Sequence, residues 1–426
     1  MIIHVVRSGE DIFSIARRYG VPAERIIRDN EIQDPNQLVP GQNLVILFYS
    51  SIYRVKMGDT LESIAEENNM TVKQLYRNNP ILGGRPEIYP GQILVLDFNQ
   101  RKQGNFKVNG YAYPNIDRDV LQKTLPYLTY ITIFTYGITE SGELIDIDDE
   151  EIIRAAREMG TAPIMHISTL GEDGKFSNEL ASRILRNERL QTELIANVLE
   201  NLENKGYYGL DVDFEYVLPE DRDRYTEFIR RMTQTLNKAG YMVFVALAPK
   251  TSADQPGLLY ESHDYPALGE ATNMVILMTY EWGYTYGPPM AVAPLDKVRD
   301  VVEYAVSEID PSKILMGIPN YGYDWTLPFV RGESKARSIS NVEAVQLADD
   351  VGAEITFDRT SASPTYHYYD EEGREHEVWF EDAQSIASKL GLARGFDLEG
   401  VSYWNIMKYF PQNYLVLNAL YDIEDV

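Results

Sequence analysis

The chain has 426 residues, of which 44% are hydrophobic, as expected for two or three soluble globular domains. A formal net charge of -26 disfavours nucleic acid as a partner, because phosphate binding needs an excess of Lys and Arg. The lack of cysteine excludes disulfides and thiolate chemistry, and no apolar run approaches the roughly 20 residues of a membrane span. Residues 1–6 lack the basic and apolar segments of a secretory signal, so we expect no conventional signal peptide.

An internal repeat fills the first hundred residues. Residues 5–16 match residues 55–65, residues 28–30 match 77–79, and residues 39–46 match 89–96. Each copy predicts a strand, a turn, two helices, a Pro-Gly turn and a second strand. Asp11 and Thr60 are the expected N-caps of the first helices, and apolar residues follow them at helical spacing.

The G-D-T-L-x-x-I-A and N-N-P…P-G-Q signatures of this repeat resemble the LysM module. That module is a small βααβ unit that binds glycans containing N-acetylglucosamine, so two such domains are expected at residues 1–48 and 52–98. The first copy has Gly9-Glu10-Asp11-Ile12 where the family usually shows Gly-Asp-Thr-Leu, which leaves open which copy binds glycan. The alternative is that both copies are folded spacers. Residues 99–106 are polar and aperiodic, and we interpret them as a linker.

From residue 107 onward, short apolar runs alternate with amphipathic helical segments. This alternation is typical of a parallel sheet covered by helices, and eight such units predict an α/β protein, a TIM (β/α)₈ barrel over residues 107–426. The predicted strands are residues 108–112, 130–135, 163–168, 208–213, 242–248, 274–279, 314–318 and 401–405. The predicted helices are residues 150–159, 178–203, 220–238, 294–306 and 412–420.

The stretch between the seventh and eighth predicted strands is too long for a simple crossover. It contains the segments 338–351 and 354–358 and a hairpin formed by residues 365–369 and 377–380. We therefore expect a small α+β insertion at about residues 322–396.

The segment of residues 207–216, which contains the predicted strand 208–213, carries three acidic residues on a single face. Side chains alternate along a strand, so Asp211, Asp213 and Glu215 share one face and residues 210, 212 and 214 the other. In a barrel the apolar face packs on the helices and the acids point inward toward the mouth. Burial and like charges raise carboxyl pKa values, so at least one of these acids should hold a proton near neutral pH. An exposed acidic strand or a divalent-metal site is the alternative.

The segment Gly-Leu-Asp-Val-Asp-Phe-Glu resembles the D-x-x-D-x-D-x-E signature of glycoside hydrolase family 18, which includes chitinases and related N-acetylglucosaminidases. The resemblance implies substrate-assisted catalysis with Glu215 as proton donor, Asp213 orienting the substrate's N-acetyl group and Asp211 supporting Asp213. The first Asp of the signature is replaced by Tyr208, which we expect to alter buried hydrogen bonding beneath the site.

Two other predicted strand ends carry the same resemblance. Met278-Thr279-Tyr280-Glu281 is similar to the family's M-x-Y-D, which implies that Tyr280 binds the N-acetyl oxygen and that Glu281 replaces the usual Asp. Trp404 matches the tryptophan that floors the pocket. The expected substrate-binding residues are Tyr216, Met278, Glu281 and Trp404. The expected catalytic residues are Asp211, Asp213, Glu215 and Tyr280. The five histidines are scattered without metal-ligand spacing, so no metal and no cofactor is expected.

The whole architecture resembles the cortex-fragment lytic N-acetylglucosaminidases of spore-forming bacteria. The resemblance implies an enzyme of the spore coat or cortex surface that cleaves β-1,4 bonds after N-acetylglucosamine in peptidoglycan cortex fragments during germination. We expect a monomer. A chitinase-like enzyme and a non-catalytic glycan-binding lectin are the alternatives. A lectin is disfavoured because inactive members of the family usually lack the acid at the position of Glu215.

Overall fold

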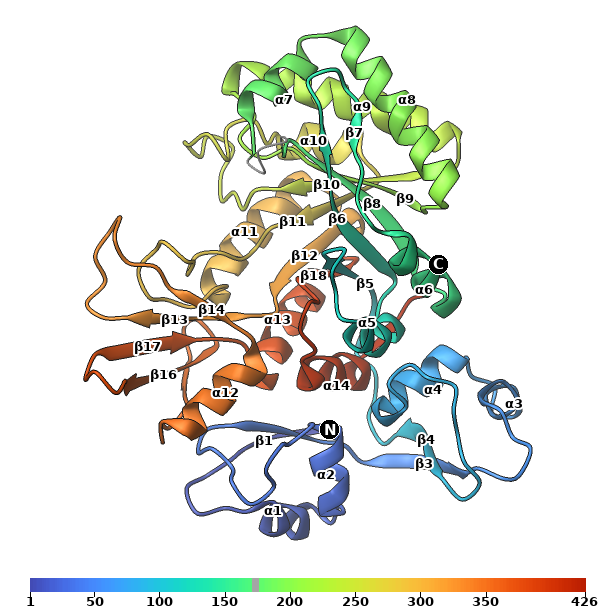
Figure 1. Ribbon diagram of the computed structural model, residues 1–426, viewed down its shortest axis with the longest axis vertical. Helices are drawn as coiled ribbons and strands as arrows, with labels where there is room; N and C mark the ends of the chain where they lie inside the picture. The colour runs from blue at the N-terminus through green and yellow to red at the C-terminus, as the bar shows by residue number, and fades with distance from the viewer. Residues whose placement is uncertain (171–175) are drawn as a thin grey trace.

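Eight parallel strands close into a barrel in the computed structural model, which describes residues 1–170 and 176–426 (Figure 1). Each strand pairs with the next in chain order, and β18 closes the ring by pairing with β5. The predicted TIM barrel and its eight strands are confirmed. The strands are β5 (Gly104–Ala112), β6 (Tyr130–Ile138), β8 (Ala162–Ser168), β9 (Gly209–Asp213), β10 (Met242–Leu247), β11 (Met274–Leu277), β12 (Ile314–Pro319) and β18 (Gly400–Trp404).

Helices surround this barrel. They are α5 (Arg118–Thr124), α6 (Glu150–Met159), α7 (Asn178–Leu185), α8 (Glu188–Lys205), α9 (Arg222–Lys238), α10 (Tyr265–Ala271), α11 (Leu295–Glu308), α13 (Ala383–Gly395) and α14 (Pro411–Leu420). The single helix expected at residues 178–203 is two helices. Asn187 separates them, because its side chain accepts hydrogen bonds from the backbone N–H groups of Arg189 and Leu190 and so starts a new helix.

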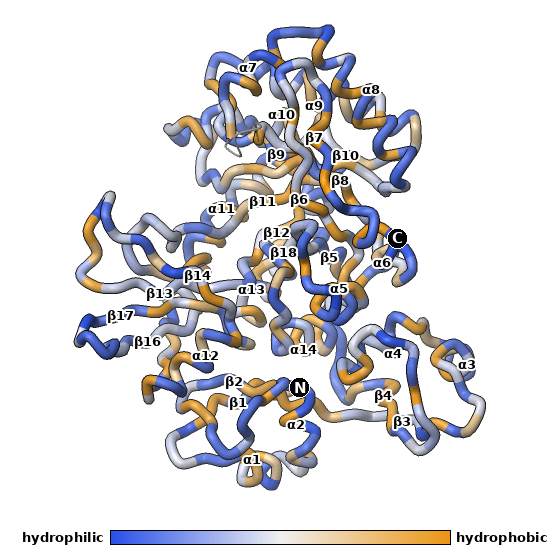
Figure 2. The backbone as a smooth tube through the Cα atoms, viewed as in Figure 1, coloured by the Kyte–Doolittle hydropathy of each residue, from blue (hydrophilic) through white to orange (hydrophobic). Residues whose placement is uncertain are grey.

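The strands bury both of their faces. Leu210, Val212 and Phe214 point outward and belong to the large core shared with the helices. Side chains from other strands, such as Tyr111 and Phe244, fill the barrel interior as a separate cluster. Apolar residues accordingly gather along the barrel strands, whereas the outer helix α8 alternates hydrophobic and hydrophilic residues (Figure 2).

The two N-terminal repeats form the expected βααβ units. The first contains β1 (Ile2–Val5), α1 (Ile12–Tyr19), α2 (Ala23–Asp29) and β2 (Asn43–Ile46); the second contains β3 (Tyr49–Arg54), α3 (Leu61–Glu67), α4 (Val72–Asn78) and β4 (Ile93–Phe98). The two strands of each unit pair antiparallel. Asp11 and Thr60 cap α1 and α3 in capping boxes, as the sequence pattern predicts.

Both units are docked on the barrel. Arg77 of the second unit is only 3% exposed, and it donates hydrogen bonds to the carbonyl oxygens of Pro126 and Ile423 at 2.6 and 3.0 Å. Asn43 of the first unit donates to Asp382, the N-cap of α13, at 2.8 Å. Buried polar groups with defined partners hold a fixed orientation. The repeats are therefore packed against the barrel along one side (Figure 1).

The linker expected at residues 99–106 is shorter in the structure. Strand β5 already begins at Gly104, because the C-terminal strand β19 (Tyr421–Ile423) pairs in parallel with residues 104–106. The terminal segment that supplies this pairing lies more than 300 residues away in the sequence, so local polarity alone does not reveal it.

The expected α+β insertion follows β12. Its sheet has the order β14-β13-β17-β16-β15, and α12 packs beside it. The elements are β13 (Gly322–Thr326), β14 (Arg337–Ile339), α12 (Asn341–Asp350), β15 (Thr356–Asp358), β16 (Ser363–Tyr369) and β17 (Glu375–Trp379). Helix α13 belongs to the range expected for the insertion, yet its apolar residues share the core of the barrel. The two-residue strand β7 (Leu144–Ile145) pairs antiparallel with the last residues of β6.

Candidate active site

The three acids of the β9 segment lie where strand alternation predicts. Asp211 and Asp213 are buried inside the barrel, and Glu215 follows two residues beyond the end of β9 and is half-buried. The strand ends at Asp213, and Tyr216 has a left-handed backbone with φ 55°, which is uncommon for a residue with a side chain. The chain thus turns directly above the acids, at the carboxyl end of the barrel where TIM-barrel sites form.

Neighbouring strands surround these acids with polar groups. Tyr111 on β5 donates a hydrogen bond of 2.6 Å to Asp211. His166 on β8 lies beside both aspartates, with Nε2 at 3.8 Å from Asp211 and 3.6 Å from Asp213. Its Nδ1 is 2.6 Å from the hydroxyl of Thr135. This network ties the acids to three other strand segments of the barrel.

The sequence patterns do not identify His166 and Tyr111 as parts of the site, because the histidines are scattered along the chain. A signal was available in the strand register. His166 pairs with Asp211 across β8 and β9, so the two side chains share the inward face. Such a pairing can be proposed from sequence only after the relative shift of the two strands is known.

Burial controls the protonation of this cluster. It raises the pKa of Asp211 to about 6, although the adjacent His166 and the Tyr111 hydrogen bond act in the opposite direction. It lowers the pKa of His166 to about 4, so this imidazole is neutral at physiological pH. Burial also raises the pKa of Asp213, and that of Glu215 is raised by burial and by the charge of Asp213. Glu215 therefore retains a proton at neutral pH, as a general acid requires.

Aromatic side chains form a wall beside the acids. The rings of Tyr280 and Trp404 stack with centroids 6.3 Å apart and an interplanar angle of 16°. Tyr111 and Phe134 meet the Trp404 ring edge-on at 5.3 and 5.2 Å. Burial and the nearby carboxylates raise the pKa of Tyr280 well above its usual range, so its hydroxyl stays a hydrogen-bond donor. Such a wall offers apolar faces to a sugar ring.

The Tyr280 ring depends on a glycine in the neighbouring strand. A Cβ added at Gly317 on β12 would lie 2.4 Å from the carbonyl oxygen of Leu277 and 2.7 Å from the Tyr280 ring. We expect Gly317→Ala to displace Tyr280 and to lower kcat about 10-fold, because small misplacements of reacting groups cost much of the rate. Steady-state kinetics on a soluble substrate measures this. The control is Gly391→Ala on α13, where an added Cβ meets no heavy atom within 4 Å, and unchanged kcat in Gly317→Ala would contradict the placement.

Glu281 joins the barrel to the insertion. It accepts a hydrogen bond of 3.0 Å from Tyr323 on β13 and another from Tyr321, and its own backbone is left-handed with φ 67°. With Trp404, these three residues line a cavity of about 350 Å³ between the barrel mouth and the insertion. The insertion thus forms one side of the cavity that borders Trp404.

The remaining predicted substrate-binding residues lie at the mouth in different settings. Met278 follows β11 and is half-buried, and its backbone N–H donates to Leu247 at 2.9 Å. Tyr216 is exposed directly after Glu215, with its ring 6.4 Å from that of Phe176. All eight predicted site residues thus come from the carboxyl ends of β9, β11 and β18.

The expectation for Tyr208 is wrong. This residue precedes β9 at the opposite end of the strand, is 38% exposed, and has its ring 6.1 Å from that of Tyr130. Its ring lies beside the first residue of β6, at the amino end of the barrel, and not beside the acids. The buried hydroxyl beneath the site is that of Tyr111.

Residues 1–170 and 176–426 contain no group of three or more His, Cys, Asp or Glu side chains arranged to hold a metal ion. The same residues contain no helix long and apolar enough to cross a membrane.

Comparison with known protein families assigns the barrel. The family described as "Glycosyl hydrolases family 18" matches residues 102–408, which include every predicted site residue. The chain belongs to glycosyl hydrolases family 18. The LysM domain matches residues 4–47 and 53–97, so this family 18 glycoside hydrolase carries two LysM domains before its barrel.

Individual relatives extend the similarity over the whole chain. A curated protein of Bacillus subtilis (strain 168), named "Cortical fragment-lytic enzyme", is 39% identical over 99% of both chains. The crystal structure of the Bacillus megaterium QM B1551 spore cortex-lytic enzyme SleL superposes with a TM-score of 0.84 at 36% identity, over 100% of this chain and 99% of that one. The SleL structure of Bacillus cereus gives 0.85 at 36% identity, covering 100% and 98%.

Proposed function

We propose that this family 18 enzyme is an N-acetylglucosaminidase that cleaves β-1,4 bonds after N-acetylglucosamine in peptidoglycan fragments of the spore cortex. The observation that carries the proposal is the column formed by the buried Asp211 and Asp213 and the half-buried Glu215, beside the Tyr280–Trp404 wall. The cortex as substrate is supported by full-length relatives that are named for lysis of cortex or cortical fragments.

The proposed mechanism uses the substrate's own N-acetyl group. Glu215 gives its proton to the leaving glycosidic oxygen while the acetamide oxygen bonds to the anomeric carbon, and the C–O bond to the leaving sugar breaks. Asp213 accepts the acetamide N–H, and Tyr280 donates to the acetamide oxygen, which keeps that oxygen aimed at the anomeric carbon. Water then opens the oxazolinium ring with Glu215 as base, and the configuration is retained. Asp211 supports Asp213 from below.

Substrate binding is proposed to rest on neutral contacts. With a net charge of -26 the protein gains no attraction to an anionic glycan, so stacking on Trp404 and hydrogen bonds must supply the affinity. The two LysM domains are proposed to bind N-acetylglucosamine units of the same wall material. We further propose that the protein acts in the spore, as a monomer.

Product analysis tests this function. Purified cortex fragments and chitin oligomers are incubated with the enzyme, and products are identified by mass spectrometry. We expect new reducing ends on N-acetylglucosamine from cortex fragments. Faster release from chitin oligomers would favour the chitinase-like alternative, and no release from either substrate would favour a lectin.

The pH profile provides a separate prediction. The proton on Glu215 is needed for activity, and its raised pKa means that this proton is lost only at pH values far above the ordinary range of a glutamate. We therefore expect kcat/KM to persist through neutral pH and to fall as pH rises through the raised pKa, with a slope of one proton. Initial rates across a pH series measure this limb. If kcat/KM already falls as the pH is raised from 4 to 5, Glu215 is not the proton donor.

A further inference from the structure

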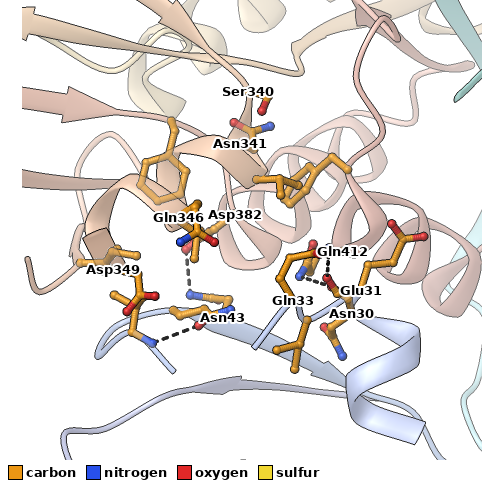
Figure 3. A pocket seen from close by; sticks show the side chains of 18 of the residues that line it. Asn30, Glu31, Gln33, Asn43, Ser340, Asn341, Gln346, Asp349, Asp382 and Gln412 are labelled. Carbon is orange, nitrogen blue, oxygen red and sulfur yellow. Dashed lines mark hydrogen bonds between the residues drawn. The ribbon is translucent and has the colours of Figure 1, made fainter. Parts of the chain in front are cut away.

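The first LysM domain contacts the barrel and the insertion at the same time. On the barrel side, Gln412 of α14 donates to the carbonyl oxygen of Asn30 at 3.3 Å, and Asn43 donates to Asp382, the N-cap of α13. Figure 3 shows Asn43 reaching Asp382 from the LysM domain. On the insertion side, contacts come from the turn of residues 39–41. The domain thus bridges two parts of the catalytic unit.

Val39 enters the hydrophobic core of the insertion. Its side chain is 3% exposed, and it belongs to one buried cluster with residues of β14, α12, β16 and β17, among them Ile339 and Val378. The core of the LysM domain itself is a separate cluster that includes Val21. The insertion therefore completes its core with a side chain of the LysM domain.

The backbone next to Val39 fits the insertion equally closely. The carbonyl oxygen of Pro40 accepts a hydrogen bond of 2.9 Å from the N–H of Ile355. A Cβ added at Gly41 would lie 1.8 Å from the carbonyl oxygen of Ile355. Two atoms cannot pack at that distance, so any larger residue at position 41 would force the turn and the insertion apart.

The equivalent turn of the second LysM domain has the same backbone in different surroundings. Gly91 matches Gly41 in the repeat, with φ of 90° and 88°, and both N–H groups donate at 2.8 Å to the residue that follows the first strand of their unit. A Cβ added at Gly91 meets no described heavy atom within 4 Å. Tyr89, the equivalent of Val39, is 69% exposed. The contact with the insertion is therefore not a requirement of the repeat.

Strand pairing connects Val39 to the substrate side of the insertion. Ile339 of β14 and Val378 of β17, which share its cluster, pair with the two β13 residues that flank Tyr323. Tyr323 donates to Glu281 at 3.0 Å, and both line the cavity of about 350 Å³ beside the aromatic wall of the site. Closely packed interiors transmit strain, so a displacement of the core at Val39 would move this side of the cavity.

We propose that the first LysM domain is a brace that positions one side of the substrate cavity. Val39 and the turn of residues 40 and 41 fix the insertion, and the insertion presents Tyr323 to Glu281. Val39 and Gly41 are positioning residues, since they act through the insertion. The inference rests on the proposed function for the identity of the glycan alone. The brace should affect even short substrates that only the catalytic site holds.

Two substitutions weaken the brace in different ways. Gly41→Ala forces the turn away from Ile355, and Val39→Ala leaves a void in the core of the insertion. The matched control for the first is Gly91→Ala, which adds the same methyl group at nearly the same φ without a neighbour. The matched control for the second is Val21→Ala, which removes the same atoms from the core of the LysM domain itself.

Steady-state kinetics on a cortex tetrasaccharide tests the brace. We expect both brace variants to raise KM about 5-fold with kcat within about two-fold of the unmodified enzyme, and both controls to leave KM unchanged. A loss of folded protein would lower the apparent kcat and leave KM unchanged. The division between KM and kcat therefore separates positioning from stability.

Tryptophan fluorescence provides a second measurement. The four tryptophans, at positions 282, 325, 379 and 404, all belong to the barrel or the insertion and none to a LysM domain. A change in their emission on addition of tetrasaccharide thus reports binding beside the insertion. We expect the dissociation constant from this titration to rise about 5-fold in the brace variants and to stay unchanged in the controls.

An unchanged KM in both brace variants, or an equal rise in their controls, would overturn the brace. If the unmodified enzyme cleaves a chitin tetrasaccharide but not the cortex tetrasaccharide, the proposed function fails, and the same comparison on chitin still tests the brace. If it cleaves neither, the fluorescence titration with the chitin tetrasaccharide decides. Equal dissociation constants in brace variants and controls would then overturn the inference.

Discussion

Replacing Glu215 with Gln is expected to lower kcat on cortex fragments about 10³-fold. The substitution keeps the shape of the side chain and removes the proton that the leaving oxygen needs, and general acid catalysis contributes rate factors of about this size. Because burial and Asp213 keep Glu215 protonated at neutral pH, the neutral amide should fit the same half-buried position without a charge change. The thermal midpoint and the pull-down on insoluble peptidoglycan should remain those of the unmodified protein.

The control for this substitution is Glu227→Gln, at an exposed position on α9 whose only role in the described structure is a surface ion pair with Arg230. It should leave kcat unchanged, since an exposed pair contributes little. Turnover of Glu215→Gln within about 10-fold of the unmodified enzyme would mean that another group donates the proton.

Asp213→Asn is expected to lower kcat at least about 10²-fold, because the carboxylate that should receive the acetamide N–H becomes an amide that can turn its own N–H groups toward the substrate. A second effect follows from the electrostatics. The charge of Asp213 raises the pKa of Glu215, so removing it should move the alkaline limb of residual activity to lower pH.

This direction of shift separates a role for Asp213 in the site from a loss of folding, which would lower activity at every pH without moving the limb. Asp300→Asn on α11, an exposed position remote from the acids, serves as the control. An alkaline limb that stays in place would contradict the coupling between Asp213 and Glu215.

Local patterns were sufficient for much of this protein. The alternation of residues 210–215 predicted which side chains enter the barrel, since the direction of a side chain on a strand depends only on its position along that strand. The elements of the LysM repeats could also be predicted from the sequence, because capping residues such as Asp11 and Thr60 act within their own helices. The resemblance to family 18 then assigned roles that alternation by itself does not supply.

Tertiary structure decided the features that depend on segments far apart in the chain. His166 and Tyr111 reach Asp211 because the barrel's register brings β5, β8 and β9 together, and no local pattern records that shift. Closure against β19 moved the start of β5 into the expected linker, and the hydrogen bond from Asn43 to Asp382 docks the first LysM domain beside α13. The shared face of Asp211, Asp213 and Glu215 is thus determined locally, whereas their raised pKa values depend on burial, which only the assembled barrel and its neighbours provide.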